Sequence, residues 1–204
     1  MATVAPYPPD DPELARLKRE LRRRARAVRA AVPAAERAVA NTRLRGHLMD
    51  WLGDRRGAAL AGFWPLGGEV DLKPLLASWH RAGGVALLPR MQGEAMPLRF
   101  HRWTPETTLE VAAFNVEEPP AASPAHRPDV VLVPLLAVDP EGYRLGYGGG
   151  YYDRTLAELG DVHAVGVALD VQRVDALPRG VHDRPLTHLV TESGVISYAR
   201  GSKR

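Results

Sequence analysis

A glycine-rich stretch flanked by an arginine and an aspartate has the residue types that bind phosphate. Residues 144–153 read Arg-Leu-Gly-Tyr-Gly-Gly-Gly-Tyr-Tyr-Asp, with four glycines in the five positions 146–150. Such a run lets the backbone bend sharply or lie close to a ligand, and N–H groups at a following helix N-terminus attract phosphate. Arg144 adds a fixed cation, and Asp153 adds a carboxylate that could hold a metal ion. The stretch indicates a nucleotide-phosphate site.

The glycines alone leave a second interpretation open, because a tight surface turn without a ligand has the same composition. Two known phosphate-binding patterns are also not met. The stretch lacks the Gly-Lys-Ser/Thr ending of a P-loop, and the spacing of Gly146, Gly148 and Gly150 before Tyr151 departs from the dinucleotide fingerprint. Other parts of the chain have to discriminate between the two interpretations.

The composition is that of an ordinary soluble protein. The 204 residues are 45% hydrophobic and 25% charged, with a net charge of +3. The absence of cysteine excludes disulfides and thiolate chemistry and fits a cytoplasmic protein. The N-terminus does not read as a signal peptide, and no apolar run approaches the roughly 20 residues of a membrane helix. We expect a single α/β domain at 13–199, with loose tails at 1–12 and 200–204.

Strand and helix patterns alternate along the chain, which predicts an open, largely parallel α/β sheet. Helical patterns begin at 13 and cover 34–52, 72–80 and 151–159. Strand patterns cover 57–64, 85–90, 98–103, 129–138, 162–169, 189–191 and 195–197, and the alternation within 98–103 predicts a strand at a sheet edge. One more short strand is expected within 107–115, and the Pro-rich residues 117–128 are expected to form a loop.

The first helix combines an apolar stripe with many arginines. The predicted stripe consists of Leu14, Leu17, Leu21, Ala25, Val28 and Val32. The other faces carry arginines, most of which are expected to form a solvated basic face: Arg16, Arg19, Arg22, Arg23, Arg24, Arg26 and Arg29. A nucleic-acid patch is the alternative, but this segment lacks aromatic residues for base stacking. Lys18 lies at the rim of the stripe, about 20° past Ala25, with Arg22 one turn further on.

Three further polar residues stand where strands or turns end. Glu69 follows the strand at 57–64, and Arg90 ends the strand at 85–90. The carboxyl ends of parallel strands are where open α/β sheets bind ligands, although Glu69 could equally interact with a helix dipole. From the residues alone, Asp183 is better explained as a turn residue before Pro185.

Residues 144–154, preceded by Val133-Pro134 and Asp139, resemble the signature of the 5-formyltetrahydrofolate cyclo-ligase family, also called 5,10-methenyltetrahydrofolate synthetase. The resemblance extends over about 17–189 and is specific at 18–22, 64–71 and 144–153. It implies a three-layer Rossmann-like sandwich with a mostly parallel sheet, of the NagB/RpiA/CoA transferase-like type. The family reaction is the ATP-dependent cyclisation of 5-formyltetrahydrofolate to 5,10-methenyltetrahydrofolate, with release of ADP and phosphate.

The resemblance also implies roles for individual residues. The ATP-binding residues would be Lys18, Arg22, Arg90, Arg144, Leu145, Gly146, Tyr147, Gly148, Gly149, Gly150, Tyr151 and Tyr152. The folate-binding residues would be Trp64, Glu69, Tyr147, Gly148, Gly149, Gly150 and Tyr151. Asp153 and Asp183 would hold Mg²⁺, and Lys18 and Arg144 would be catalytic. Family members often carry Lys or Arg within the loop, so Tyr147 and Gly149 make this loop depend more on backbone amides.

The expected partner is a reduced folate, with or without a polyglutamate tail, bound by a cytoplasmic monomer that needs neither nucleic acid nor membrane. Two alternatives stay open. One is a non-catalytic nucleic-acid-binding protein that uses the arginine-rich first helix and the glycine stretch. The other is an accessory protein of the same fold that binds ligand without turnover, against which Lys18, Glu69 and Asp153 argue.

Overall fold

A seven-stranded sheet forms the centre of the computed structural model, which describes residues 10–53, 55, 57–112 and 115–198. The strand order is β11-β10-β9-β6-β1-β2-β3, in which the inner strands are parallel and β3 and β11 pair antiparallel at the two edges. The strands are β1 Ala59–Ala61, β2 Val85–Arg90, β3 Arg99–Arg102, β6 Val130–Pro134, β9 His163–Val167, β10 His188–Thr191 and β11 Gly194–Ser197.

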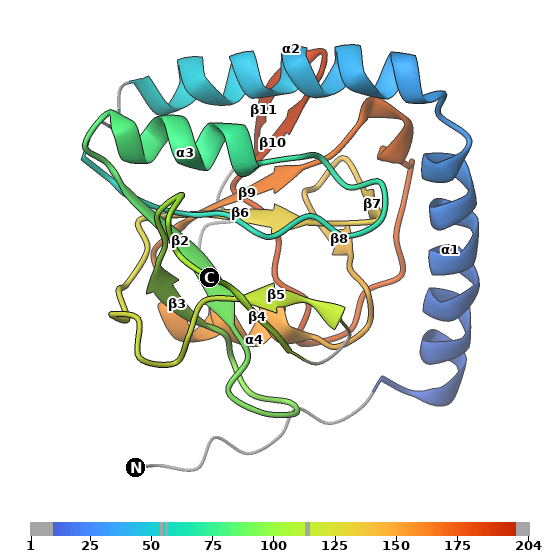
Figure 1. The fold of residues 1–204 in the computed structure, drawn as a ribbon. Helices are drawn as coiled ribbons and strands as arrows, with labels where there is room; N and C mark the ends of the chain where they lie inside the picture. Colours follow the sequence, from blue (N-terminus) through green and yellow to red (C-terminus); the bar gives the residue numbers. More distant parts are fainter. Residues whose placement is uncertain (1–9, 54, 56, 113–114, 199–204) are drawn as a thin grey trace.

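Helices cover both faces of this sheet, which gives three layers (Figure 1). The helices α2 (Ala34–Gly53) and α3 (Lys73–Arg81) lie on one face, and α4 (Tyr151–Leu159) lies on the other. The first helix, α1 (Pro12–Ala30), runs past the tips of the strand arrows beside the short pair β7 (Ala137–Val138) and β8 (Arg144–Leu145). The predicted α/β class, the mostly parallel sheet and the edge position of β3 are confirmed.

The core has one cluster on each face of the sheet. In β6, Val130 to Val133 are fully buried because successive side chains enter opposite clusters. On α2, Leu44, Leu48 and Leu52 recur every four residues and are fully buried against the sheet. Each such leucine contributes about 1.5–3 kcal/mol by leaving water.

The order in which the chain adds strands to the sheet reverses between the parallel neighbours β1 and β6. From β1 the chain crosses through α3 to β2 on one side, and from β6 it crosses through α4 to β9 on the other. In open α/β sheets a crevice forms at such a switch point, beyond the carboxyl ends of the strands. The segments that follow β1 and β6 therefore meet there, and they contain Glu69 and residues 146–150.

Two predicted segments differ from the structure. The run 129–138 divides into β6 and β7, because Pro134 has no N–H to continue a sheet ladder; β7 then pairs antiparallel with β8. The Pro-rich segment 117–128 was expected to be a loop, but it begins with β5 (Glu117–Glu118), which pairs with β4 (Glu110–Val111).

The predicted apolar stripe of α1 is also partly wrong. Leu17 and Val28 are 39% and 48% exposed, whereas Lys18 and Arg29 are buried. Leu21 and Ala25 do pack inward, against Leu145 and its neighbours. The helix is therefore rotated so that a mixed apolar and basic face meets the fold.

The first helix begins one residue before the helical pattern expected from 13. Helix α1 begins at Pro12, and the Asp11 carboxylate accepts hydrogen bonds from the backbone N–H groups of Glu13 and Leu14. Residues 1–9 of the expected first tail and all of 200–204 lie outside the described residues. Within the described part of the chain, no helix has the length and apolar character needed to cross a membrane.

Candidate active site

Residues 146–150, called the Gly loop below, have at two positions a backbone that only glycine adopts easily. Gly148 and Gly150 have φ values of 111° and 64°, in the left-handed region. Gly150 is the N-cap of α4 and has no side chain to offer the first N–H groups of the helix. An anion bound at this end of α4 could take the place of the missing side-chain cap, as in a phosphate site.

Arg144 and Asp153 fix the base of the Gly loop. The Arg144 side chain is 4% exposed, and its Nη2 lies 2.9 Å from Asp153 Oδ1. Its Nη1 donates to the carbonyl oxygen of Arg184 at 2.6 Å, and the Arg184 N–H donates back to Asp153 at 3.0 Å. This pair thus ties the first turn of α4 to the segment that carries Asp183.

Lys18 and Arg22 approach the same region from α1. Lys18 Nζ lies 2.8 Å from Asp183 Oδ2 and 3.0 Å from Asp10 Oδ2. Burial disfavours the charged form of Lys18, but hydrogen bonds to Asp183 and Asp10 outweigh it and raise its pKa above the ordinary value. Arg22 Nε donates to the Gly146 carbonyl oxygen at 3.0 Å. Arg22 therefore contacts the Gly loop directly, whereas Lys18 is held by two carboxylates, one of them on the segment that carries Asp183.

Glu69 is joined to the Gly loop through Tyr147. The Tyr147 hydroxyl donates to Glu69 Oε1, and the Leu66 N–H donates to Glu69 Oε2 at 2.8 Å. Burial raises the pKa of Glu69. Burial, followed by the charge of Glu69, raises the pKa of Tyr147. The carboxylate lies at the switch point, as the position of Glu69 after β1 predicts.

The expectation that Arg29 lies on a solvated face of α1 is wrong. Arg29 is 8% exposed and donates to the Tyr147 hydroxyl at 2.8 Å. Its spacing of seven residues from Arg22 and eleven from Lys18 places all three on one helix face. That spacing was the signal that could have identified it.

Two aromatic residues of the predicted site have different surroundings. Trp64 is half-buried, with Lys73 Nζ 4.5 Å from its ring centroid and its indole N–H donating to Glu117. Tyr152 packs into the cluster beneath α4, and burial raises the pKa of its phenol. Trp64 thus keeps part of its surface exposed, whereas Tyr152 mainly supports the loop from below.

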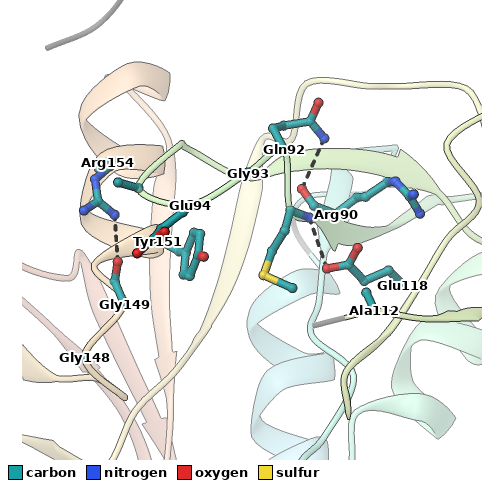
Figure 2. Close-up of a pocket in the computed structure, with 12 residues that line it drawn as sticks. Arg90, Gln92, Gly93, Glu94, Ala112, Glu118, Gly148, Gly149, Tyr151 and Arg154 are labelled. Atoms are coloured by element: carbon teal, nitrogen blue, oxygen red, sulfur yellow. Dashed lines mark hydrogen bonds between the residues drawn. The ribbon is translucent and has the colours of Figure 1, made fainter. Parts of the chain in front are cut away.

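A cavity of about 830 Å³ lies against the Gly loop (Figure 2). Gly148, Gly149 and Tyr151 form one wall, and Arg90 stands on the opposite wall. Arg90 Nη1 donates to Glu110 Oε2 at 3.0 Å and to the Pro119 carbonyl oxygen at 2.6 Å. A volume of this size suits a ligand as large as a nucleotide or a folate.

The remaining lining residues were missed from the sequence. They are Met91, Gln92, Gly93, Glu94, Ala95, Ala112, Glu118 and Arg154. Arg154 donates to the Gly149 carbonyl oxygen at 2.7 Å, and Glu118 accepts from the Met91 N–H at 3.1 Å. Burial raises the pKa of Glu118. Arg154 directly follows the Tyr-Tyr-Asp string and could have been noticed, whereas Glu118 lies in a segment without a periodic pattern.

The Gly loop therefore divides the site in two. The helix side consists of Lys18, Arg22 and Arg29 with Glu69, Arg144, Asp153 and Asp183. The cavity side consists of the residues that line the cavity, of which Arg90, Gly148, Gly149 and Tyr151 were predicted. Trp64 and Glu69, the predicted folate residues outside the loop, do not line this cavity.

The two predicted metal carboxylates fit Mg²⁺ only with help from a ligand. The two hydrogen bonds to Asp153 both fall on Oδ1, and those to Asp183 both fall on Oδ2. Among the described residues, no group of three His, Cys, Asp or Glu side chains could hold a metal ion. Mg²⁺ commonly binds one or two carboxylates together with waters and substrate phosphates, so phosphate oxygens would have to complete its shell.

Residues 15–192 match the 5-formyltetrahydrofolate cyclo-ligase family. The 5-formyltetrahydrofolate cyclo-ligase of Mycolicibacterium smegmatis is 34% identical over 194 residues, which cover 89% of this chain and 97% of that protein. The protein of the same name from Escherichia coli is 38% identical over 143 residues, which cover 67% of this chain and 79% of that protein.

Solved structures give the same result. The 5,10-methenyltetrahydrofolate synthetase of Aquifex aeolicus superposes with a TM-score of 0.79 at 33% identity, over 92% of this chain and 96% of that one. The Mycoplasma pneumoniae synthetase superposes with a TM-score of 0.70 at 20% identity, over 86% of this chain and 98% of that one, and supports the fold.

Proposed function

Because this chain belongs to the 5-formyltetrahydrofolate cyclo-ligase family, we propose that it catalyses the ATP-dependent cyclisation of 5-formyltetrahydrofolate to 5,10-methenyltetrahydrofolate. One observation about its own residues carries the proposal. The Gly loop accepts hydrogen bonds from Arg22 and Arg29 of α1, and it also lines a cavity of about 830 Å³. A loop with both contacts can bring a nucleotide phosphate and a second ligand to one point.

The chemistry explains why ATP is needed. The formyl oxygen of 5-formyltetrahydrofolate would leave as hydroxide, which is a poor leaving group. In the proposed reaction this oxygen attacks the γ-phosphorus of ATP, and the bond from that phosphorus to the oxygen of ADP breaks. The N10 lone pair then attacks the formyl carbon, N10 releases its proton, and the carbon–oxygen bond breaks to release phosphate. The products are 5,10-methenyltetrahydrofolate, ADP and phosphate.

On the helix side, we assign the phosphate-binding role to Lys18, Arg22, Arg144 and the Gly-loop amides. Positive charge and N–H donors at this point stabilise the phosphoryl group as it moves. Lys18 would exchange its contacts with Asp10 and Asp183 for phosphate oxygens. Asp153 and Asp183 would hold Mg²⁺ through their remaining oxygens, and the ion would add positive charge next to the phosphates.

For the folate, we assign recognition to Glu69, Trp64 and the cavity side. An ionised Glu69 accepts N–H donors, which a reduced pterin presents, and Trp64 offers a flat apolar surface. Arg90 and Tyr151 would face the ligand across the cavity. A cytoplasmic monomer acting on a reduced folate, with or without a polyglutamate tail, stays the prediction from the sequence.

The test is the near-ultraviolet absorbance of the methenyl product in a mixture of purified protein, 5-formyltetrahydrofolate and Mg-ATP. We expect a rise that requires ATP and falls about 100-fold or more in Lys18→Ala, since loss of a charge-stabilising group has such effects. Arg23→Ala is the matched control, because Arg23 lies on the same helix with its side chain 80% exposed.

Two results would overturn the proposal. Ligand binding without any product, in protein shown to be folded, would favour the accessory protein of the same fold. Salt-sensitive RNA or DNA binding without turnover would favour the nucleic-acid alternative.

A further inference from the structure

Arg29 is a buried cation that the proposed reaction does not use. It is 8% exposed, whereas other arginines of α1 are exposed, namely Arg16, Arg19, Arg23, Arg24 and Arg26. Its Nη1 donates to the Tyr147 hydroxyl at 2.8 Å, and its Nη2 donates to the Gly67 carbonyl oxygen at 3.0 Å. One guanidinium therefore joins α1 to both the Gly loop and the turn at 66–69.

Tyr147 links Arg29 to Glu69. An arginine can only donate, and an ionised carboxylate can only accept, so the hydroxyl accepts from Arg29 and donates to Glu69. The second carboxylate oxygen of Glu69 accepts from the Leu66 N–H, which lies in the turn that Arg29 holds through Gly67. One oxygen of Glu69 is thus oriented by Tyr147, which contacts Arg29 directly. The other is oriented by Leu66, the neighbour of Gly67, which also contacts Arg29.

We propose that Arg29 is a positioning residue for Glu69 that holds its carboxylate at the Gly loop, oriented to accept the N–H donors of a reduced pterin. The inference rests on the proposed function. Arg29 acts through Tyr147 and Gly67 and touches no reacting atom. Of the described arginines of α1, Arg29 is the one that hydrogen-bonds both Tyr147 and Gly67. Helical spacing explains this position, because it puts Arg29 on the inward face together with Lys18 and Arg22.

The charges around Glu69 make this role measurable. Burial raises the pKa of Glu69, and the hydrogen bonds from Tyr147 and Leu66, together with the positive charge of Arg29, oppose that rise. Among the described residues, Tyr147 and Tyr152 also interact with Glu69, Arg26 lies over the Tyr147 ring, and Arg37 approaches the turn at Gly68. Removing Arg29 should therefore raise the pKa of Glu69 further. Since the ionised form is the acceptor, the acidic limb of kcat/KM should move to higher pH.

The first experiment compares pH profiles of kcat/KM for 5-formyltetrahydrofolate. Arg29→Ala should move the acidic limb to higher pH and, at a fixed pH on that limb, lower kcat/KM about tenfold for each pH unit moved. Arg29→Lys, which keeps the charge, should move the limb back toward the wild-type position. Arg26→Ala is the matched control, because its guanidinium carbon is 5.8 Å from the Tyr147 ring centroid, against 5.9 Å for Arg29, yet it is exposed. An acidic limb that stays in place in Arg29→Ala would overturn the inference.

A second experiment needs no turnover and separates the inference from the proposed function. Amide hydrogen exchange in the ligand-free protein should accelerate at 66–69 and at 146–150 in Arg29→Ala, and not in Arg26→Ala. Tyr147→Phe, which removes the hydroxyl while keeping the ring, should accelerate exchange at 146–150 as well. Unchanged exchange in both Arg29→Ala and Tyr147→Phe would overturn the positioning role. An inactive wild type would instead overturn the cyclo-ligase proposal.

Discussion

The two sides of the Gly loop are built by different means. On the helix side, side chains of opposite charge meet in fixed pairs, such as Lys18 with Asp183 and Arg144 with Asp153. On the cavity side, the shape depends more on backbone conformation, with Ala95 and Gly148 at φ values of 57° and 111°. The helix side is therefore organised by charge before a ligand arrives, and the cavity side is organised by shape.

This difference predicts how each side responds to a ligand. A phosphate on the helix side has to compete with protein carboxylates for Lys18, so binding depends on charge balance and on salt. A ligand on the cavity side enters a space already shaped by the loops and meets fewer paired charges. Substitutions on the helix side should therefore have larger effects than those on the cavity side.

Arg144→Ala should have the largest effect on stability. It leaves the Asp153 carboxylate without its buried partner, and breaking a buried pair costs about 3–5 kcal/mol of the free energy of unfolding. Urea unfolding measures this change. Arg99→Ala is the control, because both side chains of the Arg99–Glu158 pair are well exposed and such pairs contribute at most about 1 kcal/mol. Equal losses in the two variants would remove the distinction that we draw for the helix side.

Glu69→Gln should reduce kcat/KM for 5-formyltetrahydrofolate by about 10- to 100-fold, since a hydrogen bond to a charged group contributes about 1.5–3 kcal/mol.

The stability of Glu69→Gln, in contrast to its activity, should not fall below that of the wild type at neutral pH. Because burial raises the folded-state pKa of Glu69, the wild type loses stability as pH rises through that pKa, and the amide does not. The variant should be at least as stable at neutral pH in thermal unfolding. A less stable variant with full activity would contradict the assigned role.

Gly148→Ala tests the loop where the two sides meet. The left-handed backbone would cost about 1–2 kcal/mol, and the new methyl group would lie 3.4 Å from the Arg22 guanidinium carbon. We expect a higher KM for ATP together with a moderate loss of stability. Gly146→Ala serves as the comparison, because nothing lies within 4 Å of a methyl group there. Identical KM values for the two variants would show that the contact with Arg22 has no role.

Ala95→Gly should have the smallest effect and concerns the cavity side alone. Relief of the left-handed backbone, about 1–2 kcal/mol, is offset by about 0.4–1 kcal/mol from the greater freedom of glycine in the unfolded chain. A melting temperature raised by a few degrees with unchanged kcat is expected. A large loss of activity would show that the cavity side depends on more than shape.

The same contrast explains what could be predicted from the sequence. The helix at 151–159 and the strand at 85–90 were predicted at their observed bounds, because periodicity and the flanking glycines define them locally. Lys18 and Arg22 could be placed because helical spacing sets their direction. The prediction for Arg29 was wrong, because it oriented α1 by apolar residues alone, whereas the buried hydrogen bonds of a guanidinium also decide the rotation of the helix.

Most residues of the cavity side could not be predicted from the sequence. Glu118 reaches the cavity because β5 pairs with β4 and its carboxylate accepts from Met91, contacts between segments with no shared pattern. The positive φ of Ala95 likewise follows from tertiary packing, since nothing in the sequence Gln-Gly-Glu-Ala-Met marks it. Residues whose position depends on pairing between distant segments carry no local signal.

The most direct test of the central claim follows the formyl oxygen itself. 5-Formyltetrahydrofolate labelled with ¹⁸O in the formyl group is incubated with the protein and Mg-ATP, and the released phosphate is analysed by mass spectrometry. If the formyl oxygen is phosphorylated at the Gly loop, one ¹⁸O atom appears in phosphate for each methenyl product formed. Methenyl product accompanied by unlabelled phosphate would contradict this account, because the oxygen would then have left without being phosphorylated.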